Sequence, residues 1–524
     1  MSLDEVVKLA ENKYLSGDLQ GAYDDARYVL SRSRTNGRAH YLLSCIAAFK
    51  GAHEDSLKLC KIAIQIDGAA AEYLAQLALC HMNLGQRLEA HKCAVQALSS
   101  EEISPIALDK LSHVFHGVAD FSRALDVLKQ LAVKDPNNSG VLANLGAVYF
   151  LCGQVGAAQE VLEKAIALDP KNIRAFGSLC GLKNARADDN YIDAIQALIK
   201  EESGTLNLIK LHYALAKQYE DIGNIEEAFA SLKKGKDIFV SATGYRIEQD
   251  INMFAAISRY IDAAPPAPHD ASRSQPLFVV GMPRSGTTVV ERILTNCTGV
   301  VSIGESIQFL ELVKQHCHGG SSRFVEASDV EMYWWSLPLE EIGKSYAAFG
   351  EAMSSGAERF VDKLPLNLLF VPLIVRALPN ARIVCSIRNP LDTVLGNYRQ
   401  LLETRTGSFG YTSSLRSTAV FVAEGARLAR KMAQCYSKQF YLLSYEELVA
   451  NPQAKAREFT RFCGIEWNSE LLKIENNNAP AGSASAAQVR SPIHSKFVGR
   501  WRRYRAYLGE AVGVFEEYGI PWDW

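Results

Sequence analysis

The 524-residue chain has no apolar run near the roughly 18 residues that a membrane-spanning helix needs. The segment MSLDEVVKLAENKYLSG, residues 1–17, is charged throughout and has no signal-peptide core. The 11 cysteines are odd in number, scattered, and form no C-x-x-C pair, which argues against a disulfide framework. These absences predict a cytoplasmic protein with reduced thiols and no membrane insertion.

An excess of charge of either sign is also missing. Lysine and arginine number 56 and aspartate and glutamate 58, for a net charge of −2. No overall basic field therefore points to nucleic acid or to an anionic membrane. The His-Cys-His stretch at residues 316–318 has no second ligand cluster beside it, so we expect no metal site.

A spacing of 34 residues recurs through the first half of the chain. A glycine or alanine marks each copy, and a small residue follows five positions later. The marks are Gly17, Gly51, Gly85, Ala119 and Gly153, and the small residues are Ala22, Ser56, Ala90, Ala124 and Ala158. An offset copy follows with Ala194 and Ala228. A small residue at each mark permits a tight turn between two helices, and the second small residue permits their close approach.

This pattern resembles the tetratricopeptide repeat (TPR), a helix–turn–helix unit of about 34 residues. The resemblance covers residues 3–237, with five clear copies and one or two irregular ones. Stacked repeats form an α-solenoid whose concave surface binds a peptide or partner protein. The alternative is a scaffold that only extends or dimerises the chain. We expect a TPR helical-repeat domain over residues 1–260.

The composition changes after this region. Residues 261–275, IDAAPPAPHDASRSQ, are rich in proline, alanine and serine, which predicts a linker. Short β-rich runs that alternate with helical segments then predict an α/β domain with a central parallel sheet over residues 276–524. The expected fold class is an α-solenoid followed by a P-loop-like α/β domain.

The stretch LFVVGMPRSGTTVVERIL, residues 277–294, combines an apolar strand, a glycine-rich turn and a helix. Gly281 and Gly286 have the spacing of the phosphate-binding loop G-x-x-x-x-G-K-[ST], but Thr287 replaces the lysine. The backbone N–H groups of this turn can still bind an oxyanion, and Arg284 is the nearest positive charge. Without the lysine that holds a triphosphate, the loop favours a shorter anion.

A second strand-to-helix turn carries another arginine. In ARIVCSIRNPLDTVLGNYRQ, residues 381–400, an expected strand over 383–387 leads to Arg388, and Pro390 suits the first turn of a helix. Ligands of parallel sheets bind where the strands end. Two such turns, each with an arginine, predict a ligand with two separated anionic groups.

The segments PRSGTT and RIVCSIRNPLDTVLGNY resemble the two nucleotide-binding elements of sulfotransferases that use 3′-phosphoadenosine 5′-phosphosulfate (PAPS), especially tyrosylprotein sulfotransferases and bacterial TPR-sulfotransferases. The resemblance covers residues 276–524 and implies that Arg388 binds the 3′-phosphate. The family usually has a serine eight positions later, where this chain has Gly396, and the candidate replacements are Asn397 or a later loop. The loop residues implied to bind the 5′-phosphosulfate are Arg284, Ser285, Gly286, Thr287 and Thr288.

Three further segments resemble parts of the same family's site. FVDKLPLN implies that Lys363 contacts the transferring group, and LLSYEELVANP implies that Tyr445 lies near the adenine. AQVRSPIHSKFVGRWRRY resembles a loop that closes over the nucleotide. Its implied contacts are Arg490, Ser491 and Arg500, with Trp501 as a packing anchor, although a solvated basic helix would have the same composition.

Sulfuryl transfer requires in-line attack by an acceptor oxygen and neutralisation of the leaving phosphate, for which Lys363 and Arg284 are the candidates. A base must take the acceptor's proton. The resemblance implies Glu305, which lies 21 residues after Arg284 in VVSIGESIQF. Three alternatives stay open: a one-residue slip onto Ser306, an exposed helix-start glutamate with no role, and His494 as the base.

Three functions compete. The first is a PAPS-dependent sulfotransferase that acts on a hydroxyl or phenol, including peptide tyrosine, with repeats that recruit the acceptor protein, peptide or small molecule. The second is an inactive repeat scaffold with a vestigial nucleotide site, to which Gly396 lends weight. The third is a P-loop kinase, which needs a lysine and a magnesium site that the sequence lacks. The set Arg284, Glu305, Lys363 and Arg388 favours the first.

Overall fold

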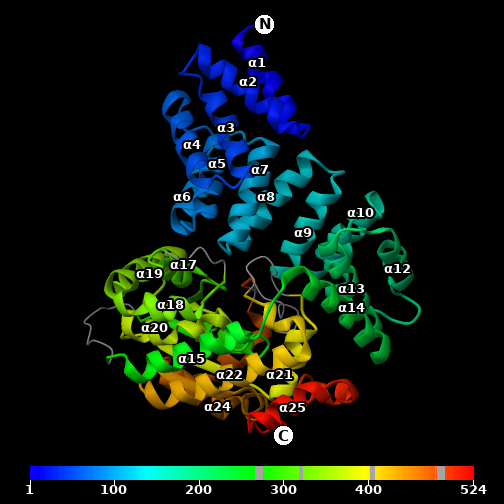
Figure 1. Ribbon diagram of the computed structural model, residues 1–524, viewed down its shortest axis with the longest axis vertical. Coiled ribbons are helices and arrows are strands. Elements are labelled where there is room, and N and C mark those ends of the chain that lie inside the picture. Colours follow the sequence, from blue (N-terminus) through cyan, green and yellow to red (C-terminus); the bar gives the residue numbers. More distant parts are fainter. Residues whose placement is uncertain (266–274, 318–322, 402–407, 478, 481–489, 524) are drawn as a thin grey trace. The chain divides into compact units, whose positions relative to one another are not determined.

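The computed structural model describes residues 1–265, 275–317, 323–401, 408–477, 479–480 and 490–523. It divides into two compact units, Met1–Val148 and Tyr149–Trp524 (Figure 1). Across the described residues, no helix combines the length and the apolar composition needed to cross a bilayer.

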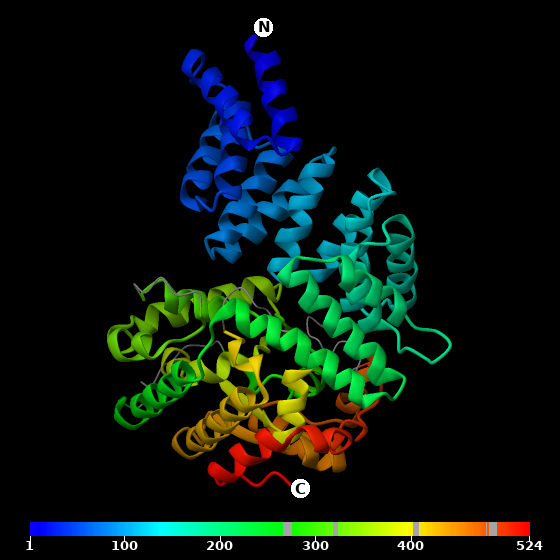
Figure 2. The same ribbon diagram turned by 45° about the vertical axis from the view of Figure 1, so that its right-hand side comes forward.

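The first unit consists of helices stacked in consecutive antiparallel pairs (Figure 2). The helices are α1 (Leu3–Leu15), α2 (Leu19–Arg32), α3 (Gly37–Phe49), α4 (His53–Asp67), α5 (Ala71–Asn83), α6 (Arg87–Ala97), α7 (Pro105–Gly117), α8 (Phe121–Lys134) and the start of α9 (Ser139–Leu151). Several begin with a side-chain cap, as Asp120 does for α8 when it accepts a hydrogen bond from the amide of Arg123.

Every mark of the 34-residue spacing is a turn with positive φ. The φ values are 88° for Gly17, 78° for Gly51, 72° for Gly85, 62° for Ala119 and 78° for Gly153. The small residues five positions later, Ala22, Ser56, Ala90, Ala124 and Ala158, are each 0% exposed. The turn and the close helix contact that define the repeat are therefore both present, which confirms the prediction of tetratricopeptide repeats.

The second unit begins with further helices of this kind: α10 (Val155–Leu168), α11 (Ile173–Leu182), α12 (Ile192–Glu201), α13 (Thr205–Asp221) and α14 (Ile225–Thr243). Gly223 and Ala228 repeat the turn and the buried small residue, with φ of 87° and an exposure of 1%. The offset copy is less regular at α12, where Ala194 is exposed and Ile195 takes the buried position.

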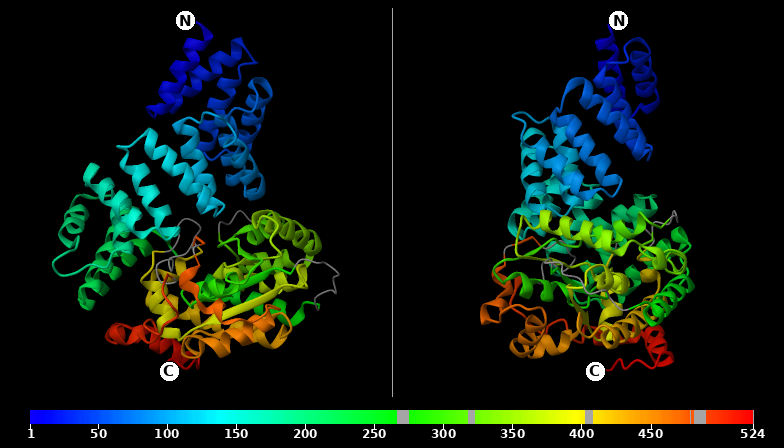
Figure 3. Two further views of the ribbon diagram at one scale, coloured as in Figure 1. Left: turned by 180° about the vertical axis from the view of Figure 1, so that it is seen from behind. Right: turned by 90° about the vertical axis from the view of Figure 1, so that its left-hand side faces the viewer.

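A five-stranded parallel sheet with the order β2-β3-β1-β4-β5 lies within the second unit (Figure 3). The strands are β1 (Leu277–Gly281), β2 (Val300–Ser302), β3 (Arg359–Asp362), β4 (Arg382–Ile387) and β5 (Phe440–Ser444). The register places Val279 of β1 beside Val384 of β4. All five residues of β1 are buried, as expected for the central strand of a covered parallel sheet. The predicted α/β domain with a parallel sheet is confirmed.

Helices cover both faces of the sheet. α16 (Thr287–Thr295) and α24 (Pro452–Phe462) share one core with β1 and β4, built around Val279, Val290 and Phe459. On the opposite face Phe278 stacks on Tyr346 of α19, with ring centroids 5.5 Å apart. The other helices are α15 (Glu248–Ala263), α17 (Gln308–Lys314), α18 (Ala327–Met332), α19 (Leu339–Met353), α20 (Val371–Ala377), α21 (Pro390–Tyr398), α22 (Leu415–Cys435), α23 (Tyr445–Ala450) and α25 (Gly509–Glu517).

The predicted domain boundaries at residues 260 and 276 stay a prediction. α15 runs to Ala263 and packs against α18 and α22, which belong to the sheet region. Of the predicted linker, residues 266–274 lie outside the described part of the chain.

Candidate active site

The candidate residues follow the carboxyl ends of all five strands. Lys363, Arg388 and Tyr445 come directly after β3, β4 and β5. The glycine-rich loop follows β1, and Glu305 lies three residues after β2. Because the strands are parallel, their carboxyl ends meet at one edge of the sheet, and the fold brings these distant segments together there.

The loop between β1 and α16 has the shape that an anion site requires. Arg284 has φ of 71° and Gly286 has φ of 99°, so the backbone turns sharply before the helix begins at Thr287. A Cβ at Gly286 would lie 2.3 Å from the ring of Tyr445, so only glycine fits beneath this tyrosine. Ser285 is 1% exposed, and its Oγ has no hydrogen-bond partner. The helix N-terminus and this hydroxyl are together suited to an oxyanion.

Gly396 explains how Arg284 fits against α21. A Cβ at position 396 would lie 2.8 Å from Cβ of Arg284. The serine usual in the resembling family would therefore overlap the stem of Arg284 in this chain. Burial, together with the nearby charges of Arg388 and Arg500, lowers the pKa of Arg284 to about 10. An anionic ligand would relieve this repulsion between cations.

Arg388 is held in place by several contacts on one side of the site. Its guanidinium donates to the carbonyls of Arg284 (3.3 Å) and Phe497 and to the carboxylate of Asp392 (3.2 Å). Its Cζ lies 4.9 Å from the ring centroid of Tyr445. Its Nε is buried without a partner, so one donor remains for a ligand.

Asp392 is a site residue that the sequence analysis missed. Its side chain is 0% exposed and lies in the first turn of α21, four residues after Arg388. Besides the hydrogen bond from Arg388, its carboxylate accepts hydrogen bonds from the backbone N–H groups of Gly499 (2.7 Å) and Trp501 (2.9 Å). Asp392 thus joins the β4–α21 turn to residues 490–501, which we call the closing segment. The sequence signal for it was an aspartate four residues after Arg388, in the first turn of the helix that Pro390 begins.

Asn397 has a different position from the one that the sequence implied. It is fully buried, and its Nδ2 donates to the carbonyls of Pro283 (2.7 Å) and Thr393 (2.8 Å). Its Oδ1 accepts from the hydroxyl of Tyr411 at 2.8 Å. The side chain therefore supports the loop from behind.

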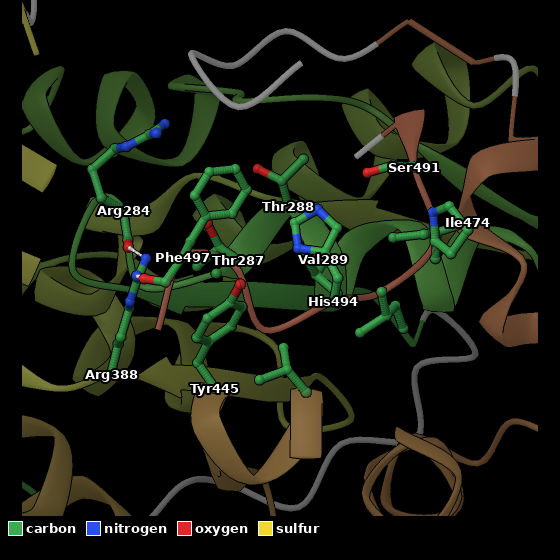
Figure 4. Close-up of a pocket in the computed structure, with 14 residues that line it drawn as sticks. Arg284, Thr287, Thr288, Val289, Arg388, Tyr445, Ile474, Ser491, His494 and Phe497 are labelled. Atoms are coloured by element: carbon green, nitrogen blue, oxygen red, sulfur yellow. Dashed lines mark hydrogen bonds between the residues drawn. The ribbon is translucent and has the colours of Figure 1, made fainter. Parts of the chain in front are cut away.

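A pocket of ≈ 590 Å³, part of it open to solvent, lies between the loop, Arg388, Tyr445 and the closing segment (Figure 4). Figure 4 shows the hydrogen bond from Arg388 to the backbone of Arg284, whose own side chain extends away from Tyr445. Of the implied donor-binding residues, those that line the pocket are Arg284, Gly286, Thr287, Thr288, Arg388, Tyr445 and Ser491. Those outside the lining are Ser285, Asn397, Arg490 and Arg500.

Lys363 and Glu305 form an ion pair at the neighbouring strand ends. Lys363 is 1% exposed and donates through Nζ to Oε1 of Glu305, whose side chain is 34% exposed. Oε2 of Glu291 lies 3.8 Å from the same Nζ. Burial by itself would lower the pKa of Lys363, but Glu305, Glu291 and Asp362 outweigh it, and its pKa is raised. The lysine is therefore held as a cation, and Glu305 has the exposure that a base for an external acceptor needs.

Glu291 is the second residue that the sequence analysis missed. It lies on α16 with 6% exposure and accepts a hydrogen bond from Oγ of Ser302 at 2.5 Å. Its position in the run TTVVERIL shows no pattern that separates it from a surface glutamate, so only the packing of α16 against β2 and β3 reveals its contact with Lys363.

The closing segment enters the pocket with Ser491, His494 and Phe497. Arg500 instead pairs with Glu220 of α13, Nη2 to Oε1 at 2.6 Å. Trp501 is 1% exposed, in keeping with the packing role expected of it. His494 is 5.2 Å from Phe497, ring centroid to ring centroid, and lines the pocket on the side of Ile474 (Figure 4).

Within the described ranges, no group of three or more histidine, cysteine, aspartate or glutamate side chains is arranged to hold a metal ion. His318, in the His-Cys-His stretch, lies outside the described residues.

Two family models match parts of this chain. Residues 276–469 match the profile of the sulfotransferase family, and residues 118–181 match a tetratricopeptide repeat. The chain carries a sulfotransferase-family domain. The match to this domain begins one residue before β1, continues through Glu305, Lys363, Arg388 and Tyr445, and ends before the closing segment.

Two relatives show the extent of the similarity. An uncharacterised protein of Aquifex aeolicus is 26% identical over 405 residues, which are 75% of this chain and 52% of that protein. The chain thus spans about half the length of that relative. A putative protein-tyrosine sulfotransferase of Caenorhabditis briggsae is 24% identical over 238 residues, which are 43% of this chain and 80% of that protein.

Among solved structures, the sulfotransferase domain of the Synechococcus PCC 7002 olefin synthase aligns with a TM-score of 0.34 and 16% identity. The alignment covers 49% of this chain and 99% of that one.

Proposed function

We propose that the protein transfers a sulfuryl group from PAPS to a hydroxyl or phenol acceptor. The observation that carries this proposal is the meeting of two arginine-bearing turns, β1–α16 and β4–α21, at one pocket. Such a pocket is suited to a nucleotide with anionic groups at both the 5′ and the 3′ positions. The membership of this domain in the sulfotransferase family supports the same donor.

The residues of the pocket fit this nucleotide in three ways. The N-terminus of α16, whose Thr287 and Thr288 line the pocket, suits the 5′ group. Arg388, with its unpartnered Nε, suits the 3′-phosphate, because a guanidinium binds phosphate through directed hydrogen bonds. Tyr445, which lines the pocket, offers an aromatic wall for the adenine.

The donor supplies the sulfuryl group, and the protein supplies position, charge and a base. Glu305 takes the proton of the acceptor hydroxyl as the acceptor oxygen bonds to sulfur and the bridging S–O bond breaks. Lys363 and Arg284, with the amides of the loop, neutralise the charge that develops on the departing 5′-phosphate. The proton ends on Glu305 and the electron pair on the phosphate oxygen.

The acceptor that we favour is a tyrosine phenol in a protein or peptide. The Caenorhabditis briggsae relative is named as a putative protein-tyrosine sulfotransferase, and repeats of the kind found here commonly bind peptides. In this proposal the repeats recruit the acceptor, while a small hydroxylated molecule is the alternative acceptor class.

Titration with 3′-phosphoadenosine 5′-phosphate tests the nucleotide site without an acceptor. We expect micromolar binding by calorimetry that does not depend on magnesium, and much weaker binding of ATP with magnesium, since the loop has no lysine. Arg388→Ala should abolish binding. Arg382→Ala, at the opposite end of the same strand, is the matched control.

Absence of bisphosphate binding by the folded wild-type protein would contradict the proposed function and favour the inactive scaffold. Tighter binding of ATP with magnesium than of the bisphosphate would favour a kinase.

A further inference from the structure

Residues 491–499 form one wall of the nucleotide pocket yet have no helix or strand of their own. Within this stretch the backbone N–H of Val498 donates to the carbonyl of Ser495, at 2.9 Å. A wall without regular secondary structure depends on what holds its two ends. The two ends are Arg490 and residues 499–501, and both contact helices of the repeats that belong to the second unit.

Arg490 anchors the first end on the turn between α9 and α10. Its Nη2 lies 3.4 Å from the carbonyl oxygen of Leu151, and its Nη1 donates to the carbonyl of Asn477 at 3.2 Å. Gly153 makes room for the guanidinium, since a Cβ there would lie 2.3 Å from Cζ of Arg490. A turn glycine of the 34-residue spacing thus also receives the closing segment.

Glu220 of α13 anchors the second end. Its side chain is 3% exposed, and its two carboxylate oxygens pair with two different arginines. One is Arg500, which opens the helical turn after Gly499, and the other is Arg399 at the end of α21. The same end is also held by α21, because the carboxylate of Asp392 accepts hydrogen bonds from the backbone amides of Gly499 and Trp501.

A buried carboxylate is unfavourable unless its partners are well placed, and here each partner belongs to an element of the pocket. Arg399 ends the helix that begins beside Arg388, and Arg500 ends the closing segment. Neither arginine lines the pocket itself. The pairing of Glu220 with Arg399 and Arg500 therefore acts on the position of the pocket wall, and other residues contact the ligand.

We propose that the turn at residues 151–153 and the helix α13, both in the second unit, are a structural part of the nucleotide pocket, and that Glu220 is a positioning residue that holds its closing segment through Arg500. This inference rests on the proposed function for the identity of the nucleotide. It gives the repeats a role beyond recruitment of an acceptor: they set the affinity for the donor. The contact surface lies within this chain, between α13 and residues 499–501.

Glu220→Gln in the full chain tests the proposal, because glutamine keeps the size and removes the charge. We expect the Kd for 3′-phosphoadenosine 5′-phosphate to rise about tenfold, the loss that one weakened charge pair commonly produces. Glu220→Asp should restore part of the affinity. In Glu220→Gln with Arg500→Gln, the second change should add little, since both act through one contact.

The direction of the effect separates positioning from simple electrostatics. If Glu220 acted only through its charge, its removal near an anionic ligand would tighten binding. Asp250→Asn is the matched control, because Asp250 is also buried, at 2% exposure, pairs with Arg323, and lies outside the pocket lining. An unchanged or lower Kd in a folded Glu220→Gln protein would overturn the proposal, as would an equal rise of the Kd in Asp250→Asn.

Hydrogen–deuterium exchange gives a readout that needs no nucleotide. In Glu220→Gln, residues 490–501 should exchange faster than in the wild-type protein, while the strands β1 and β4 keep their protection. If the wild-type protein fails to bind the bisphosphate, the proposed function fails, and this exchange experiment still decides whether Glu220 holds the segment. Unchanged exchange at residues 490–501 would overturn the anchoring.

Discussion

The buried ammonium of Lys363 donates a hydrogen bond to the carboxylate of Glu305, so the two groups that we assign to the transfer step neutralise one another. Glu291 lies 3.8 Å from the same ammonium on the side of α16. Lys363 would therefore keep a carboxylate neighbour if its contact with Glu305 were broken. In this arrangement Glu291 stabilises the cation, and Glu305, the more exposed carboxylate, is the one that meets the acceptor.

The first prediction concerns this pair. Lys363→Met should lower kcat for sulfuryl transfer by about 100- to 1000-fold, because it removes a charge that stabilises the leaving phosphate. The Kd for the bisphosphate should rise as well, because its 5′-phosphate is the group whose charge Lys363 neutralises in this proposal. The measurement is release of 3′-phosphoadenosine 5′-phosphate from PAPS with a mixture of tyrosine-containing peptides as the acceptor.

Lys344→Met is the control for that experiment, because Lys344 pairs with Glu340 on the exposed surface of α19. Thermal unfolding should accompany the assay, since loss of a buried charge partner costs about 3–5 kcal/mol. A folded Lys363→Met protein with wild-type kcat would exclude the assigned role.

The second prediction concerns Gly396→Ser, which restores the residue usual in the resembling family. We expect it to raise the Kd for the bisphosphate about tenfold, because a Cβ only 2.8 Å from that of Arg284 must displace the phosphate loop, and overpacking costs about 1–3 kcal/mol. Gly513→Ser, on α25 with no atom within 4 Å of its Cβ, is the control. Tighter binding by Gly396→Ser would show that the serine supplies a phosphate contact.

The third prediction concerns pH and Lys236. This lysine of α14 is 2% exposed and lies 5.4 Å and 5.0 Å from the ring centroids of Tyr213 and Tyr398. Burial lowers its pKa to about 7, whereas an unfolded lysine has its ordinary pKa near 10.4. Between these two values the unfolded chain binds the extra proton, so stability should rise with pH by up to about 1.4 kcal/mol per unit.

Lys236→Met should remove this contribution and be more stable than the wild-type protein at pH 7, with the difference shrinking toward pH 10. The measurement is the free energy of unfolding in urea at several pH values between 7 and 10. Lys233→Met, exposed on the same helix, should show no such trend. A constant difference between Lys236→Met and the wild-type protein across this range would contradict the lowered pKa.

The fourth prediction concerns Ala119, which has φ of 62° where the other marks of the spacing carry glycine. A left-handed backbone costs a residue with a Cβ about 1–2 kcal/mol. Ala119→Gly should therefore raise the denaturant midpoint of the first unit. Ala132→Gly, within α8, should lower it, because glycine weakens a helix. A lower midpoint for Ala119→Gly would show that this turn carries no strain.

The repeats were predictable because their determinants are local. A glycine at a turn and a small residue five positions later act within one helical hairpin, and their 34-residue recurrence is visible without coordinates. The strand–turn–helix segments around Arg284 and Arg388 are local in the same sense. Their placement at one sheet edge followed from the general rule for parallel sheets.

Glu291, Asp392 and Glu220 were not assigned from the sequence, because their functions depend on partners far along the chain. Glu220 meets Arg500 across 280 residues, and Asp392 meets Gly499 across 107. A buried and a surface carboxylate look alike in a sequence. The expectation that Arg500 and Asn397 contact the nucleotide came from resemblance to a family, which does not describe the contacts that these particular side chains make with their neighbours.

The amino-acid sequence by itself determined the order of the parts, the repeat, the two arginine-bearing turns and the residues that could carry charge to a donor. The tertiary structure alone decided which of those charges face the pocket and which are paired elsewhere. The physical reason is that hydrophobic periodicity and turn geometry act over a few residues, whereas burial and charge pairing depend on which segments the fold packs together.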